Sequence, residues 1–144
     1  MSNSYSISNG KLSRCDVDTA APGPGEVTVE IQASSINYRD LGIQAGFYPS
    51  RQGVVPLSDG AGTIVAVGEG VLGLVPGQLV ASCFYPFWEA GPATERNHSA
   101  SLGCEMDGLL RHRATLPETA FIETPEYLTA SQAATLPCAA VTAW

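Results

Sequence analysis

The most regular pattern of apolar and polar positions lies at residues 27–32, where Val27, Val29 and Ile31 alternate with polar residues. A period of two predicts a half-buried β-strand, because successive side chains of a strand point to opposite faces. Glycine- and proline-rich turns separate it from other apolar runs, which is typical of a meander or small barrel. These runs predict strands at 5–7, 62–67, 78–82, 109–116 and 121–122.

Three segments predict helices instead. Residues 37–44 fit one short helical turn. Thr129 and Gln132 have the spacing of a capping box, so a helix is expected to begin after Thr129 and to stop at Pro137. Residues 138–144 are rich in alanine and predict the start of another helix.

Residues 84–107 have few periodic apolar positions and predict a long irregular loop, a kind of segment that often carries function. The aromatic residues near its start, Phe84, Tyr85, Phe87 and Trp88, fit either a patch of the core or a contact face for another part of the protein. Two cations in Arg111-His112-Arg113 predict that the strand at 109–116, which contains them, is exposed at a sheet edge, where charge blocks unwanted pairing.

The composition narrows the class of protein. Hydrophobic residues make up 44% and charged residues 15% of the 144, which fits a soluble globular domain. The net charge of −7 disfavours nucleic acid and membrane surfaces as partners. Residues 1–10 have no apolar core of a signal peptide, so we expect a cytoplasmic location. The four cysteines form no C-x-x-C pair and are expected to be reduced thiols.

Several segments, taken in order, resemble one family. Together they are similar to the GroES-like catalytic domain of the medium-chain dehydrogenase/reductase superfamily. The segments are Pro24–Val27, Ser35–Leu41, Pro56–Gly62, Val67–Val71, Ala133–Pro137 and Thr142–Trp144.

The resemblance implies a mainly β fold, a GroES-like, partly open β-barrel with short helices. Residues 1–126 would be the catalytic, substrate-binding domain, and 127–144 a linker helix and the truncated start of a nucleotide-binding domain. No glycine-rich phosphate-binding motif stands between a strand and a long helix, and the last helix has no polar cap. We therefore expect a truncated chain, whether natural or made by cloning.

The resemblance also bears on metal chemistry. Asn37, Ser58 and Cys138 match the family positions that bind catalytic zinc, and an amide, a hydroxyl and one thiolate are not a zinc site. Cys83 and Cys104 do not reproduce the family's four-cysteine structural site. The resemblance thus narrows to the zinc-free, quinone-oxidoreductase-like branch. In that branch NADP or NAD, in reduced form, delivers hydride to a carbonyl, quinone or enone.

In the same branch, residues matching Asn37 and Tyr38 lie beside nicotinamide and substrate. Hydride addition builds charge on oxygen, so Tyr38 is the candidate donor and Asn37 the candidate orienting residue. Thr142 matches a position that borders the nicotinamide. The candidate apolar pocket wall consists of Tyr48, Phe84, Phe87 and Trp88.

Several polar residues also have a purely structural interpretation. Asn37 could cap a turn, and Asp40 could cap a helix or pair with an arginine. Asp59 could stabilise the glycine-containing turn that follows it. Cys138 fits a small buried thiol, which is favoured over a ligand. The two histidines fit surface residues or hydrogen-bonded fillers.

Three functional hypotheses follow. The first is the substrate-binding half of an NAD(P)H-dependent oxidoreductase, inactive and without tight cofactor binding as this fragment. The second is a stand-alone β-domain that forms a homo-oligomer or docks to a partner through its aromatic loop and apolar C-terminal segment. The third, least favoured, is metal binding through scattered cysteines and histidines.

Overall fold

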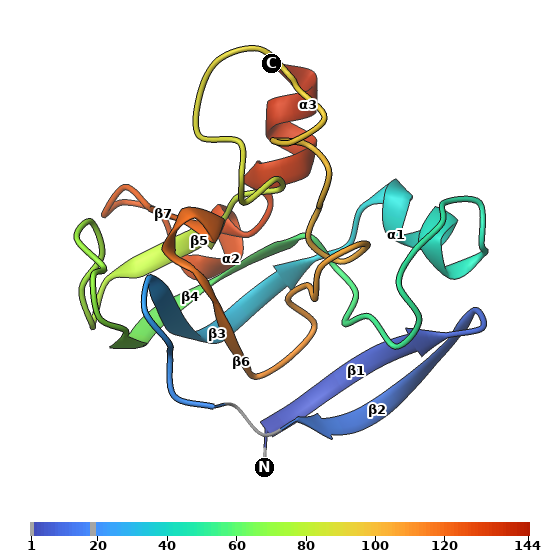
Figure 1. Ribbon diagram of the computed structural model, residues 1–144, viewed down its shortest axis with the longest axis horizontal. Coiled ribbons are helices and arrows are strands. Elements are labelled where there is room, and N and C mark those ends of the chain that lie inside the picture. Colours follow the sequence, from blue (N-terminus) through green and yellow to red (C-terminus); the bar gives the residue numbers. More distant parts are fainter. Residues whose placement is uncertain (1, 18–19) are drawn as a thin grey trace.

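The structure is a computed structural model that describes residues 2–17 and 20–144 (Figure 1). Its main element is a five-stranded antiparallel sheet in the order β6-β3-β4-β5-β7. Within the described residues β6 and β7 do not pair, so the barrel is open, as the sequence predicts. The strands are β3 (Glu26–Ser35), β4 (Asp59–Val67), β5 (Leu79–Ser82), β6 (Arg113–Pro117) and β7 (Phe121–Glu123).

The curved sheet encloses an apolar core. The strand predicted at 27–32 is confirmed, because these residues lie in β3. Val27 and Val29 are fully buried, and Thr28 between them is buried too. Ile64 and Val80 meet them from β4 and β5, and Leu109 closes the core from the loop before β6. The Gly60-Ala61-Gly62 motif allows close strand packing, since a side chain on Gly62 would collide with the Glu30 carbonyl of β3.

A separate two-stranded hairpin precedes the sheet. It consists of β1 (Ser2–Ser8) and β2 (Lys11–Val17), and only the first of these strands was predicted. Asn9 and Gly10 join them, both with positive φ (50° and 72°), which is the geometry of a tight hairpin turn. The Asn-Gly pair is a hairpin signal that the prediction missed.

The helices are short. They are α1 (Tyr38–Gln44), η1 (Glu118–Ala120), α2 (Ala130–Ala133), η2 (Leu136–Ala140) and α3 (Val141–Ala143). The capping box of α2 is confirmed, with Thr129 and Gln132 bonded reciprocally. The predicted stop at Pro137 is wrong: α2 ends at Ala133, and Pro137 lies in the first turn of η2, where a missing N–H is tolerated.

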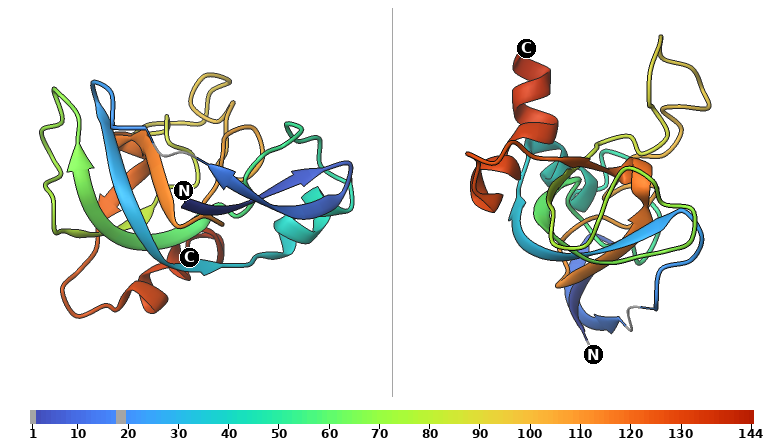
Figure 2. Two further views of the ribbon diagram at one scale, coloured as in Figure 1. Left: turned by 90° about the horizontal axis from the view of Figure 1, so that it is seen from below. Right: turned by 90° about the vertical axis from the view of Figure 1, so that its left-hand side faces the viewer.

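The C-terminal segment leaves the body of the domain. Small side chains of α2 pack on the sheet, with Ala133 and Ala134 against Ala61 and Ala81. From there η2 and α3 project away from the sheet, as Figure 1 and the right view of Figure 2 show. Among the described residues, no helix has the length and apolar character needed to cross a bilayer.

The strand at the β6 edge departs from prediction in two ways. It begins at Arg113 rather than at residue 109. His112 and Arg113 are exposed and face Glu30, in agreement with an edge strand. The expectation that Arg111 is exposed is wrong, because its Nε and Nη2 atoms are buried beside β1, where Arg111 bridges to Ser4.

Candidate active site

The first part of the site is the junction of β3 and α1. Asn37 is the N-cap of α1, and its backbone N–H donates to Asp40 Oδ2 over 2.7 Å. This confirms the capping interpretation of Asn37 and Asp40. The Nδ2 amide nitrogen of Asn37 is nevertheless buried and has no hydrogen-bond partner in the described part of the chain. A capping role therefore leaves one donor of Asn37 unused.

The second part is a group that we call the polar cluster, made of Ser58, Asp59, Ser82 and the backbone N–H of Cys138. Asp59 is 0% exposed. Its Oδ1 accepts from Ser58 Oγ over 2.6 Å, and its Oδ2 accepts from the Cys138 N–H over 2.9 Å. Ser82 Oγ donates to the Ser58 carbonyl over 2.9 Å. The cluster thereby fixes η2 to strands β4 and β5, which is more than the turn-holding role predicted for Asp59.

Burial dominates the electrostatics here. Burial raises the pKa of Asp40, partly offset by the Asn37 N–H and by the Arg39 guanidinium. Burial also raises the pKa of the Cys138 thiol, and the carboxylates of Asp59 and Asp40 add to that rise. Cys138 is therefore held as a protonated thiol at neutral pH.

The third part is the loop after β5. We call residues 84–102 the aromatic loop. The Arg39 guanidinium lies 4.4 Å from the centre of the Phe84 ring, so the loop begins beside α1. Tyr85 meets Phe84 edge-on with centroids 4.7 Å apart, and Trp88 lies 6.0 Å from Tyr85. Phe87 is about half exposed at the outer part of the loop.

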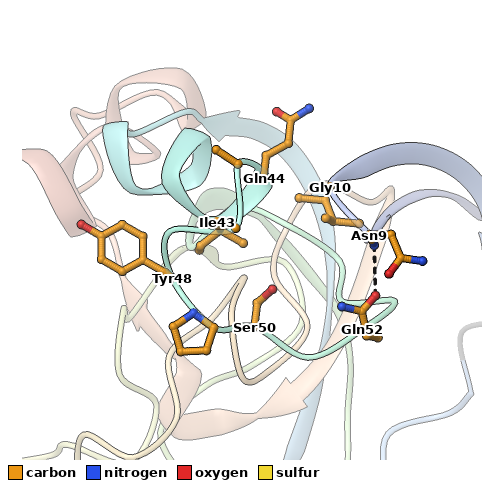
Figure 3. A pocket seen from close by; sticks show the side chains of 11 residues that line it. Asn9, Gly10, Ile43, Gln44, Tyr48, Ser50 and Gln52 are labelled. Atoms are coloured by element: carbon orange, nitrogen blue, oxygen red, sulfur yellow. Dashed lines mark hydrogen bonds between the residues drawn. The ribbon is translucent and has the colours of Figure 1, made fainter.

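Tyr48 lies elsewhere. It lines a half-open pocket of about 380 Å³ between the hairpin turn and the end of α1 (Figure 3). The Tyr48 ring packs directly over Gly42, where a side chain would collide with it. The pocket also has Ile7, Ile43 and uncharged polar residues such as Gln52, which accepts from the Asn9 N–H. Tyr48 and the aromatic loop therefore do not share one wall in this structure.

The remaining candidates are accessible. Tyr38 follows Asn37 on α1 and is 85% exposed. Thr142 is exposed on α3. The structure thus brings Asn37, Tyr38 and Phe84 to one region, because Arg39 between them contacts Phe84.

Two parts of the site were missed from the sequence. One is Arg39, which joins α1 to the aromatic loop. The other is the role of Asp59 as acceptor for Cys138, a residue 79 positions later. The available signal was a carboxylate just before the strand predicted at 62–67, because a carboxylate that becomes buried needs donors nearby.

Of the three positions that match the family's zinc ligands, two share one hydrogen-bond partner. The Ser58 hydroxyl and the Cys138 N–H are both directed to Asp59. In the described ranges no group of three or more His, Cys, Asp or Glu side chains is placed to hold a metal.

Comparisons with known proteins agree with this fold. Residues 23–126 match the family model of the alcohol dehydrogenase GroES-like domain. A zinc-type alcohol dehydrogenase-like protein of Schizosaccharomyces pombe is 46% identical over 123 residues, which cover 84% of this chain and 36% of that protein. The chain therefore spans about a third of the length of this relative.

Solved structures of longer proteins also match this chain over part of their length. A crystal structure of a putative alcohol dehydrogenase from Sinorhizobium meliloti 1021 superposes with a TM-score of 0.84 at 35% identity, covering 99% of this chain and 44% of that one. The acetophenone reductase from Geotrichum candidum NBRC 4597, in complex with NAD, has a TM-score of 0.81 at 26% identity. The superposition with the reductase covers 94% of this chain and 43% of the reductase chain.

Proposed function

The chain belongs to the family of alcohol dehydrogenase GroES-like domains, and from this membership we propose that it is the substrate-binding half of a zinc-independent, NAD(P)H-dependent oxidoreductase. The substrate class is a carbonyl or a conjugated quinone or enone. As an isolated fragment the chain binds the cofactor weakly and is inactive. NAD complexed with the Geotrichum relative supports the cofactor class.

The observation that carries the proposal is the unused donor of Asn37. A buried amide N–H without a partner costs free energy, so such a group is retained where a ligand completes its bonding. Reduction of a carbonyl places negative charge on oxygen, and a preorganised donor stabilises that charge. Asn37 is preorganised because the cap of α1 fixes its backbone.

Tyr38 supplies the second function. Its phenol is exposed on the same end of α1 and is free to reach a substrate oxygen. NAD(P)H, when bound, supplies the hydride. Thr142 would border the cofactor from α3, and Tyr38 would donate a proton to the substrate oxygen while Asn37 orients it.

Zinc independence rests on the donor set at Asn37, Ser58 and Cys138. The relative from Schizosaccharomyces pombe carries a zinc-type name, which makes this part of the proposal the sharpest to test. In this chain the Asp59 carboxylate accepts hydrogen bonds from both the Ser58 hydroxyl and the Cys138 N–H.

The experiment joins this chain to the part of the Schizosaccharomyces pombe relative that follows the aligned segment. NADPH and NADH oxidation is followed with an aromatic ketone, an enone and a quinone, with and without a zinc chelator. We expect activity that survives the chelator and falls about a hundredfold in Asn37→Ala. The role of Tyr38 is tested with Tyr38→Phe. Its matched control is Tyr127→Phe, which changes an exposed tyrosine near α2. Loss of activity with chelator and recovery with zinc would refute zinc independence.

A second candidate function has one observation in its favour. Val141 is 70% exposed on α3 and Trp144 is fully exposed, so the projecting segment presents apolar surface to solvent. This surface suits self-association of the chain into a homo-oligomer without catalysis. Sedimentation of the chain over a range of concentrations tests it: a Trp144→Ser variant that is monomeric, where the parent is not, supports this function, and a concentration-independent monomer excludes it.

A further inference from the structure

The aromatic loop is closed at its neck. The Leu102 N–H donates to the Phe84 carbonyl over 3.1 Å, which brings the two ends of the loop together. Ser101, beside Leu102, is held by Glu105, whose Oε2 accepts from both the N–H and the hydroxyl of Ser101 over 2.8 Å. The neck is therefore an ordered platform from which the exposed part of the loop extends.

Arg39 contacts this neck at three points. Its Nη1 donates to the Leu102 carbonyl over 2.9 Å, and its Nη2 donates to Ser101 Oγ over 2.9 Å. The plane of the guanidinium carries the third contact, to the Phe84 ring. Only a planar fork with several donors makes all three at once, so lysine is not an equivalent residue here.

The position of Arg39 in the chain gives these contacts a functional meaning. It directly follows Tyr38 and precedes Asp40, whose carboxylate caps α1. The guanidinium therefore sets the distance between the start of α1 and the aromatic loop. From Phe84 the contacts continue to Tyr85 and then to Trp88 and His98.

We propose that Arg39 is a positioning residue that clamps the aromatic loop to α1, so that Phe84 and the rings behind it form the substrate wall beside Asn37 and Tyr38. An aromatic wall favours planar conjugated carbonyls over small aliphatic ones, because offset or edge-on ring contacts add to burial. The clamp itself is independent of the proposed function, whereas the substrate preference rests on the proposed function.

The clamp is tested on the chain itself. In a Trp144→Phe background, Trp88 is the remaining tryptophan and reports on the loop. We expect Arg39→Met to raise amide hydrogen exchange at residues 85–100 about tenfold and to make Trp88 more accessible to a neutral quencher. Arg39→Lys fails to restore the loop, although it keeps the charge.

Arg14→Met is the matched control, because Arg14 bonds Asn3 on the hairpin. If Arg39→Met does not fold, Ser101→Ala removes the acceptor of Nη2, together with the hydroxyl's bond to Glu105, and gives a smaller effect in the same direction. Loop exchange and Trp88 quenching in the Arg39 variants equal to those of Arg14→Met would overturn the clamp.

The substrate preference is tested in the joined enzyme described above. Arg39→Lys is expected to raise the KM for acetophenone about fivefold more than the KM for butanone. Equal changes for both ketones would refute the preference. Absence of any activity in the parent enzyme would count against the proposed function alone, because the exchange and quenching results do not depend on it.

Discussion

The apolar core of the sheet and the polar cluster at the start of β4 are equally buried but differ in chemistry. In the core, side chains such as Ile64 and Val80 pack in a cluster of buried apolar residues, and their burial stabilises the fold directly. In the polar cluster, Asp59 buries a carboxylate that must find donors to offset its loss of water. The difference indicates that the core maintains the fold, whereas the cluster holds a particular arrangement of segments, as a functional site requires.

The largest effect is expected in the core. Ile64→Ala should lower the free energy of unfolding by about 3 kcal/mol, because it leaves a cavity among packed strands. Val65→Ala, one residue later on the opposite face and 40% exposed, should cost less than about 0.5 kcal/mol. Urea unfolding of both variants measures the difference, and similar losses would show that the two faces of β4 are not distinct.

The polar cluster comes next. Asp59→Ala removes the acceptor of the Ser58 hydroxyl and of the Cys138 N–H, so unfolding should become easier by about 2 kcal/mol. Asp59→Asn keeps one acceptor oxygen, so its free energy of unfolding should fall by less than that of Asp59→Ala. A variant as stable as the parent would mean that burying this carboxylate costs as much as its hydrogen bonds contribute.

The pH dependence of Asp40 gives a smaller effect. Burial raises its pKa above 3.8 in the folded state, so the folded chain binds the proton more tightly than the unfolded chain. This stabilisation is complete below about pH 3.8 and is lost as the pH rises through the folded-state pKa. Between about pH 3 and about pH 7, the parent should therefore lose stability relative to Asp40→Asn, as measured by urea midpoints. A difference that grows in favour of the parent would contradict the sign.

The smallest effect is expected for polar contacts at the surface. Glu30 pairs with His112 at 3.3 Å and with Arg113 at 3.4 Å, and all three side chains are well exposed. Glu30→Gln should change the free energy of unfolding by less than about 0.5 kcal/mol. A loss as large as that of Asp59→Ala would show that burial is not what distinguishes the polar cluster.

The sequence predicted the core better than the site. The period of two at Val27 and Val29 identified β3, because alternation depends only on neighbouring residues. The hairpin strand β2 was missed because its residues are mostly polar and exposed. Pro137 was misread because proline ends one helix but also suits the first turn of another.

The site depends on contacts between distant residues, which periodicity does not encode. Asp59 and Cys138 are 79 positions apart, and Arg39 reaches Leu102 across 63 positions. The capping role of Asn37 was within reach of local reasoning, since it involves Asp40 three residues later. Its unused Nδ2 donor became visible only once the fold enclosed it.

Zinc retention by the purified chain tests the account most directly. The chain is loaded with zinc, dialysed, and analysed for metal beside the Asn37→Cys, Ser58→His double variant, which together with Cys138 restores a Cys-His-Cys ligand set. We predict that the parent retains no zinc and that the double variant retains about one ion per chain. Zinc held by the parent at a similar level, and lost in Cys138→Ser, would contradict the account.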